Sequence, residues 1–201
     1  RVRVDGLIPL EGQGEFELDV AGLRLERLAR IAQIETPLEG LVNGHISMTG
    51  TAEDPRIEGT FSGSDLRYGS LSFSEAVSDA RYQDLAILGE IRLSEGGREV
   101  LVAEGAVPAD LRFRSGFPGV PDAPISLDVQ VDSFPAAIPL AAVAALEEVN
   151  GTLSGQFHVG GTSGDLEPSG ELRLRGGAVL VPALGVRYQG VEARFGLNPD
   201  A

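Results

Sequence analysis

Few side chains in this sequence are of the kinds that perform catalysis or hold metals. The two histidines, His45 and His158, each follow an Asn-Gly pair and lie within stretches of alternating apolar and polar residues. A metal site would need further carboxylate ligands near them, and the spacing offers no such cluster. We therefore interpret both histidines as solvent-facing residues of strands.

The other candidates have structural readings that explain them better. Glu147 and Glu148 are adjacent, so on a helix they point apart and form a solvated face. Ser62 lies between glycines but lacks the strand–turn–helix pattern of a nucleophile elbow. Asp54 and Asp165 fit turns; as repeated acids they could bind Ca²⁺, but the alternating ligands of a calcium loop are absent. We expect no enzyme activity, no metal and no cofactor.

Charge and composition exclude further classes. The chain of 201 residues has 30 acidic and 16 basic residues, a formal net charge of −14, and no cysteine. A nucleic-acid groove needs clustered basic residues, so no nucleic-acid partner is expected. Electrostatic adhesion to anionic lipid heads is disfavoured for the same reason. Without cysteine there is no disulfide or thiolate metal site.

No apolar run approaches the roughly 18 residues of a membrane span, and no signal peptide precedes the first residue. The sequence starts within a strand-like pattern, in which Val2 and Val4 alternate with arginines. We therefore expect a piece of a longer polypeptide, whose anchor or targeting segment lies elsewhere.

Apolar residues alternate with charged or polar residues along most of the chain, which predicts about thirteen antiparallel strands with one wet face. The apolar residues assigned to one shared face are Phe16, Leu18, Val20, Ile46, Met48, Leu111, Phe113, Ile125, Leu127, Val129, Val131, Leu153, Phe157, Val159, Leu172, Leu174, Val191 and Phe195. Turns are predicted at the pairs Asn43-Gly44, Gly96-Gly97, Asn150-Gly151, Gly160-Gly161 and Gly176-Gly177. A phase shift of the apolar residues predicts a bulge at Gly190.

Two segments have helical spacing instead. Residues 23–34 and 138–148 each carry an apolar stripe, and Pro139 suits the first turn of the second helix. We expect both helices to pack on the sheet as plugs. The fold predicted is all-β with two short helices.

The strand–helix–Asn-Gly order occurs twice, in one unit of about 14–93 and another of about 125–197. Gly50-Thr51 and Asp54 return as Gly161-Thr162 and Asp165. Matching order with small insertions is typical of stacked repeats, so 1–201 is interpreted as one continuous repeat segment.

The apolar face is larger than two helices can cover. The predicted strands leave about 600–700 Å² of it uncovered, at or above the largest apolar patch usual on a soluble monomer. The sheet must therefore fold onto itself, close, or hold something apolar. Composition alone leaves a self-packed sandwich and a lipid groove open.

The turn and strand motifs resemble the TamB family, which belongs to the larger AsmA-like group. They read Asn150-Gly151, Gly161-Thr162, Asp165, then GELRL from Gly170 and VPALG from Val181. The resemblance implies an elongated, curled antiparallel sheet (a β-taco or open barrel) with an apolar concave face. It also implies a periplasmic protein of the Gram-negative cell envelope, membrane-anchored in its full length, which works with an outer-membrane TamA-type barrel.

This resemblance implies that the apolar face binds phospholipid acyl chains and supports phospholipid transport to the outer membrane. A charge at Leu172 or Val129 is then expected to block transfer more than it unfolds the sheet. The alternative is an assembly and translocation factor whose strand edges pair with client barrel strands by β-augmentation. A third interpretation is an envelope spacer without a ligand.

Overall fold

The computed structural model describes residues 1–7, 12–31, 38–68, 71–112, 119–137, 147–181 and 186–198. These residues form one sheet and one short helix. In chain order the elements are β1 (Val2–Leu7), β2 (Gly14–Arg24), α1 (Leu25–Ile31), β3 (Leu38–Gly50), β4 (Pro55–Tyr68), β5 (Leu71–Gln83), β6 (Ala86–Glu95), β7 (Arg98–Pro108), β8 (Ser126–Pro135), β9 (Glu147–Gly161), β10 (Leu166–Val181) and β11 (Val186–Leu197).

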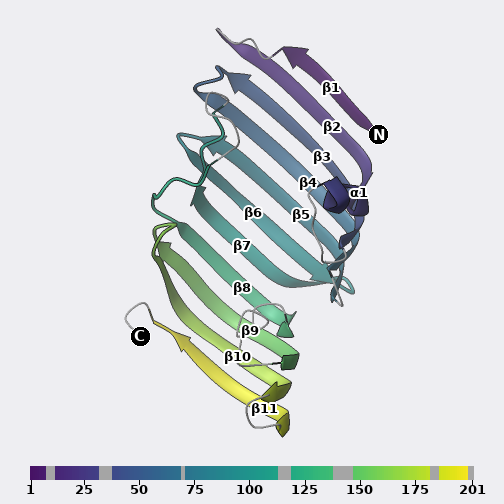
Figure 1. The fold of residues 1–201 in the computed structure, drawn as a ribbon, viewed down its shortest axis with the longest axis vertical. Helices are drawn as coiled ribbons and strands as arrows, with labels where there is room; N and C mark the ends of the chain where they lie inside the picture. The colour runs from purple at the N-terminus through teal and green to yellow at the C-terminus, as the bar shows by residue number, and fades with distance from the viewer. Residues whose placement is uncertain are drawn as a thin grey trace.

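The sheet has the simplest possible topology. All eleven strands follow chain order from β1 to β11, and each pairs antiparallel with its sequence neighbours. Figure 1 shows the strands stacked along the long axis of the molecule, with β1 and β11 at opposite ends. Because β1 and β11 do not pair with each other, the sheet stays open, and the all-β prediction is confirmed.

The sheet curls, and one ring contact measures how strongly. Phe73 on β5 and Phe134 on β8 stack with ring centroids 6.0 Å apart. Two strands separate β5 from β8, so in a flat sheet the two backbones would lie about 14 Å apart. The contact therefore crosses the concave side. Phe73 and Phe134 belong to a buried cluster with Val100, Val129 and Val131.

Two members of that cluster reach the concave side through irregularities in strand pairing, which the alternation of apolar and polar residues in the sequence does not reveal. A register shift between Leu93 and Ser94 leaves Val100 as an extra residue on β7, and its side chain is 3 % exposed. On β8 a second shift follows Val131, and Ser133 takes a positive φ of 55°. This bulge changes the phase of the strand, so that Phe134 is buried on the same face as Val131 although it lies three positions further along the chain.

The turns predicted at Asn43-Gly44, Asn150-Gly151 and Gly176-Gly177 are wrong, because all three pairs lie inside strands. The Oδ1 atom of Asn43 instead accepts a hydrogen bond (2.9 Å) from the amide of Gly22, at the bulge on β2. Gly44 leaves room for Phe61, since a Cβ there would lie 2.6 Å from that ring. The two residues thus serve a bulge and a packing contact rather than a hairpin.

With those turns absent, strands run longer than predicted. The described residues hold eleven strands rather than about thirteen. Leu111 belongs to the connection between β7 and β8 and not to a strand, and Phe113 lies outside the described residues. The bulge predicted at Gly190 is present: β10 pairs Gly177 with Val191 and Ala178 with Gln189, which leaves Gly190 unpaired with a φ of 66°.

The helices also differ from the predicted ranges. Within 23–34, α1 covers Leu25–Ile31 and packs on β3 and β2, with Ala29 buried. Glu26 in its first turn and Arg30 in its last match the helix dipole. Residues 138–146 of the second predicted helix lie outside the described residues. Its last two residues, Glu147 and Glu148, form the start of β9 instead.

Candidate functional site

The concave side of the sheet is here called the inner face. Its residues form rows that run across the strands, and each member of a row pairs with the next member on the neighbouring strand. The Tyr82 row contains Gly6, Phe16, Met48, Ile57, Tyr82, Ile87 and Val107. The Leu18 row contains Val4, Leu18, Ile46, Gly59, Ala80, Gly89, Gly105, Leu127, Val159 and Pro168.

Two more rows continue the pattern. The Phe61 row contains Val2, Val20, Gly44, Phe61, Ser78, Ile91, Ala103, Val129, Phe157, Gly170 and Leu197. The Leu93 row contains Val42, Gly63, Ala76, Leu93, Leu101, Val131, Gly155, Leu172 and Phe195. These four rows include no charged residue, and the hydroxyls of Ser78 and Tyr82 are their only polar side-chain groups.

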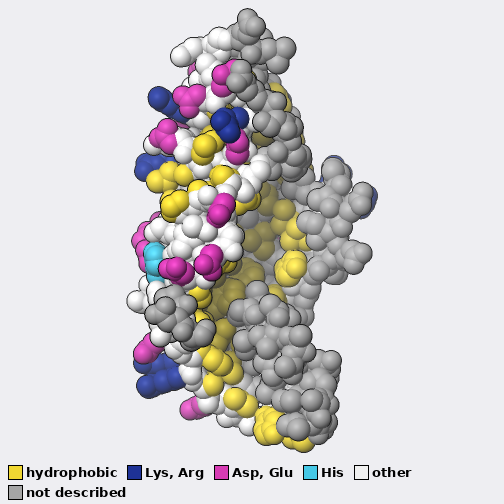
Figure 2. Space-filling view, turned by 60° about the vertical axis from the view of Figure 1, so that its left-hand side comes forward, with side chains coloured by type: hydrophobic (Ala, Val, Ile, Leu, Met, Phe, Trp, Pro, Cys, Tyr) yellow, Lys and Arg dark blue, Asp and Glu magenta, His cyan; other side chains and the backbone are white. Residues whose placement is uncertain are grey.

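Part of this apolar surface is open to solvent in the middle of the sheet. Phe61 on β4 is 36 % exposed and Ile91 on β6 is 41 % exposed. Both lie in the Phe61 row, several strands from either edge, so their exposure is not an edge effect. Figure 2 shows hydrophobic side chains lining a hollow, with acidic and basic side chains along its flank.

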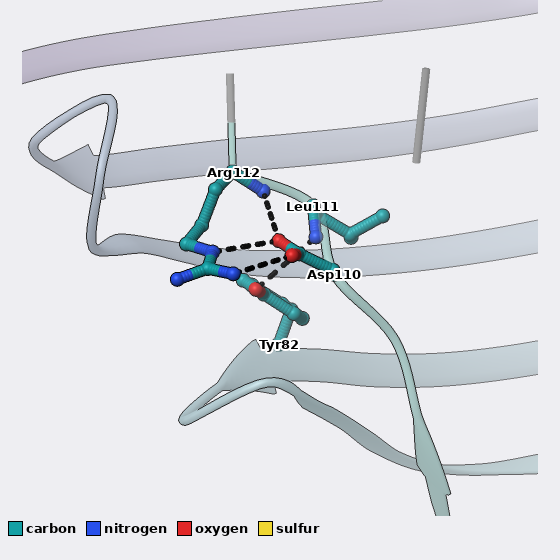
Figure 3. Close-up of polar contacts among 4 residues, drawn as sticks. All are labelled: Tyr82, Asp110, Leu111 and Arg112. Carbon is teal, nitrogen blue, oxygen red and sulfur yellow. Dashed lines mark hydrogen bonds and ion pairs between the residues drawn. The ribbon is translucent and has the colours of Figure 1, made fainter. Parts of the chain in front are cut away.

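One end of the inner face is bordered by the connection that follows β7. The amide of Ala109 donates to the carbonyl of Leu85 (2.9 Å), and the amide of Leu111 donates to the Tyr82 hydroxyl (3.2 Å). Tyr82 is 4 % exposed. This buried hydroxyl therefore ties the connection to the rim of the sheet (Figure 3).

An ion pair holds the same connection in shape. The Asp110 carboxylate accepts hydrogen bonds from Arg112 Nε (2.8 Å), Arg112 Nη2 (2.6 Å) and the Arg112 amide (3.1 Å), as Figure 3 shows. The side-chain bonds, and then the backbone bond, lower the pKa of Asp110 to about 2. The same contact raises the pKa of Arg112. The pair fixes the shape of the connection, because the same carboxylate binds both the side chain and the backbone amide of Arg112.

The opposite side, here called the outer face, carries the polar residues. His45 Nδ1 lies 2.8 Å from Asp19 Oδ1, and His158 Nδ1 lies 2.9 Å from Asp128 Oδ1. Each histidine thus meets an aspartate of the preceding strand. No group of three or more His, Cys, Asp or Glu in the described part of the chain could hold a metal ion.

The predicted face residues are mostly brought together. Of those predicted, Phe16, Leu18, Val20, Ile46, Met48, Leu127, Val129, Val131, Phe157, Val159, Leu172 and Phe195 lie in the four rows. Leu153, Leu174 and Val191 pack together at the inner face of β9–β11. Ile125 precedes β8 and donates its amide to the Gly161 carbonyl (3.0 Å). Leu111 lies on the rim instead.

The prediction missed Phe61, Tyr82, Ile91, Phe73, Val100 and Phe134. For the first three a signal existed, because each lies in a stretch of alternating residues on β4, β5 or β6. For Phe134 and Val100 the bulges remove that signal. Within the described residues, no helix is long and apolar enough to cross a membrane.

The geometry can be compared with known proteins. The family model of the TamB C-terminal domain matches residues 1–189. No curated protein and no solved structure matches significantly. A match that covers nearly the whole chain, with the open curled sheet and its uncharged inner face, leads to one conclusion: the chain belongs to the TamB family.

Proposed function

We propose that this chain is a segment of a bridge-like protein that binds phospholipid acyl chains on its inner face and supports phospholipid transport to the outer membrane. The observation that carries the proposal is apolar surface left open inside the curl. Phe61 and Ile91 keep 36 % and 41 % of their surface exposed in rows without a charged residue. A self-packed sandwich would cover such residues.

The chemistry of the inner face suits an acyl chain better than a polar ligand. Tyr82 already uses its hydroxyl on the Leu111 amide, which leaves Ser78 as the one free polar group in the four rows. A sugar, nucleotide or peptide backbone would lose its hydrogen bonds to water there without replacement. A hydrocarbon chain loses none. The open edges of the sheet would let a headgroup remain in water.

Family membership supports the cellular setting. The TamB family consists of non-enzymatic proteins of the cell envelope that work with TamA. Within our proposal, the full-length protein is anchored in the inner membrane and this segment lies in the periplasm. The aliphatic inner face then gives acyl chains a path along the long axis of the sheet.

A second function is favoured by the sheet edges. Val2 and Val4 on β1 are 55 % and 60 % exposed, and Val186 and Tyr188 on β11 are 43 % and 45 % exposed. Open edge strands can pair with strands of another protein, so the segment could act in barrel assembly with a TamA-type partner by β-augmentation.

The test is to extract the purified segment with organic solvent and measure phospholipid by mass spectrometry. Two variants make it specific. Ile91→Asp places a charge on the inner face of β6, and Val77→Asp places the same charge on the outer face of β5, where the side chain is 43 % exposed. We expect Ile91→Asp to lose bound lipid while keeping its circular dichroism spectrum, and Val77→Asp to keep both.

Equal lipid in the two variants would contradict an inner-face site. A wild-type segment that holds no lipid, but crosslinks through its edge strands to client strands, would favour the assembly function instead. A segment with neither property would be a spacer.

A further inference from the structure

A row of four carboxylates crosses the outer face of the middle strands. Asp79 on β5 pairs with Glu90 on β6, Glu90 with Glu104 on β7, and Glu104 with Asp128 on β8. Residues that pair directly across antiparallel strands have Cβ atoms about 5 Å apart, and like charges in such pairs repel each other. We call these four residues the acidic row.

Only the second and last members of the row contact a basic side chain. Arg92 contacts Glu90, and His158 contacts Asp128 at 2.9 Å. Within the described residues, no basic side chain forms an ion pair with Asp79 or Glu104. Repulsion along the row is therefore only partly compensated.

The inner face directly beside the acidic row is nearly free of side chains. The Leu18 row there consists of Gly59, Ala80, Gly89 and Gly105 on β4 to β7. A Cβ added to Gly89 would lie 2.3 Å from the Asp79 carbonyl oxygen, and one added to Gly105 would lie 2.0 Å from the Ser126 carbonyl oxygen. The neighbouring backbone already occupies that space, as glycine permits at a sharp bend.

These two features favour the same deformation. When a sheet curls, side chains on its concave side approach one another and those on its convex side separate. Small inner residues permit the approach, and repelling outer carboxylates favour the separation. The acidic row spans β5 to β8, which are the strands whose curl brings Phe73 and Phe134 into contact at 6.0 Å.

We propose that the acidic row is an electrostatic device that sets the curl of the sheet at β5–β8, and with it the width of the inner face. Salt weakens repulsion between exposed charges. The curl therefore relaxes as ionic strength rises, and cations that gather along the row open the groove. This inference concerns the shape of the sheet and stands whether or not the inner face binds lipid.

The absence of cysteine in the natural sequence permits a direct measurement. Spin labels on Ser62→Cys of β4 and Gln156→Cys of β9 flank the acidic row, and both positions are exposed on the outer face. Pulsed electron spin resonance gives the distance between the labels. Asp79→Asn with Glu104→Gln removes the two charges without an ion-pair partner, and we expect a shorter distance because labels on the convex side approach each other as the sheet flattens.

Raising sodium chloride from about 20 mM to about 500 mM should shorten the distance in the parent protein and change it little in the neutralised variant. The matched control is Glu15→Gln with Glu17→Gln, which removes two exposed carboxylates from the outer face of β2, away from the row. The control should keep the parent distance.

An unchanged distance in the neutralised variant, at low and at high salt, would overturn the proposal. So would an equal shift in the control, because the effect would then follow net charge and not the row. If the neutralised variant melts at a higher temperature but keeps the parent distance, the carboxylates repel each other without changing the curl. That result would also contradict the proposal.

Discussion

The inner and outer faces of this sheet are built from alternate residues of the same strands, yet they follow different rules. On β6, Glu90 faces outward and contacts Arg92, while the next residue, Ile91, faces inward without a polar neighbour in its own row except Ser78. The histidines and carboxylates that could have formed a catalytic site pair with one another on the outer face. The face proposed to act is therefore the one without reactive groups.

The largest difference in stability between the two faces is expected when a charge is placed within the buried cluster of the inner face. Val129 is 8 % exposed among Phe73, Val131 and Phe134, so Val129→Asp buries a carboxylate without a partner. We expect a loss of about 3–5 kcal/mol in the free energy of unfolding, measured by urea denaturation. Gln156→Asp on the outer face of β9, where the residue pairs with Glu171, should lower it by no more than about 1 kcal/mol.

The burial of Val129 limits what this variant can test. The sequence predicts that a charge there blocks lipid transfer more than it unfolds the sheet, but at a residue of the buried cluster the two effects cannot be separated. At the exposed Ile91 they can. If Val129→Asp and Gln156→Asp cost the same, the buried cluster contributes no more to stability than the outer face does.

Alternation along the strands was enough to predict the two faces, because successive side chains of a strand point to opposite sides. It placed Leu18, Val129 and Phe157 correctly on one face. It could not place Phe134, since the bulge at Ser133 depends on how β8 meets β9 and not on local sequence. The Asn-Gly pairs misled for a similar reason: Asn43 caps a bulge on another strand.

Two phenylalanines of the inner face sharpen the comparison within one face. Phe134 is 7 % exposed and stacks on Phe73, whereas Phe61 is 36 % exposed. Phe134→Ala should lower the free energy of unfolding by about 3 kcal/mol, because it leaves a cavity and removes the contact across the curl. Phe61→Ala should cost about 1 kcal/mol, since much of its surface is already in water. If the two variants lose the same free energy of unfolding, measured by thermal unfolding, then Phe61 is as buried in solution as Phe134.

The smallest effect is expected at the rim, where the inner face meets the connection after β7. Asp110 has a pKa lowered to about 2 by its hydrogen bonds from Arg112, below its ordinary value of 3.8. A carboxyl group whose pKa is lower in the folded state stabilises the fold above its unfolded pKa. That contribution is lost as pH falls through about 2. Asp110→Asn should therefore be less stable than the parent by a nearly constant amount from pH 7 to about pH 5, and the two should converge between about pH 4 and pH 2.

Chemical denaturation at each pH measures the difference, and the carboxyl chemical shift of Asp110 reports the titration itself. A difference that vanishes already near pH 4 would mean that Arg112 does not hold the carboxylate in solution, and the connection after β7 would then lack the ion pair that fixes its shape at the rim.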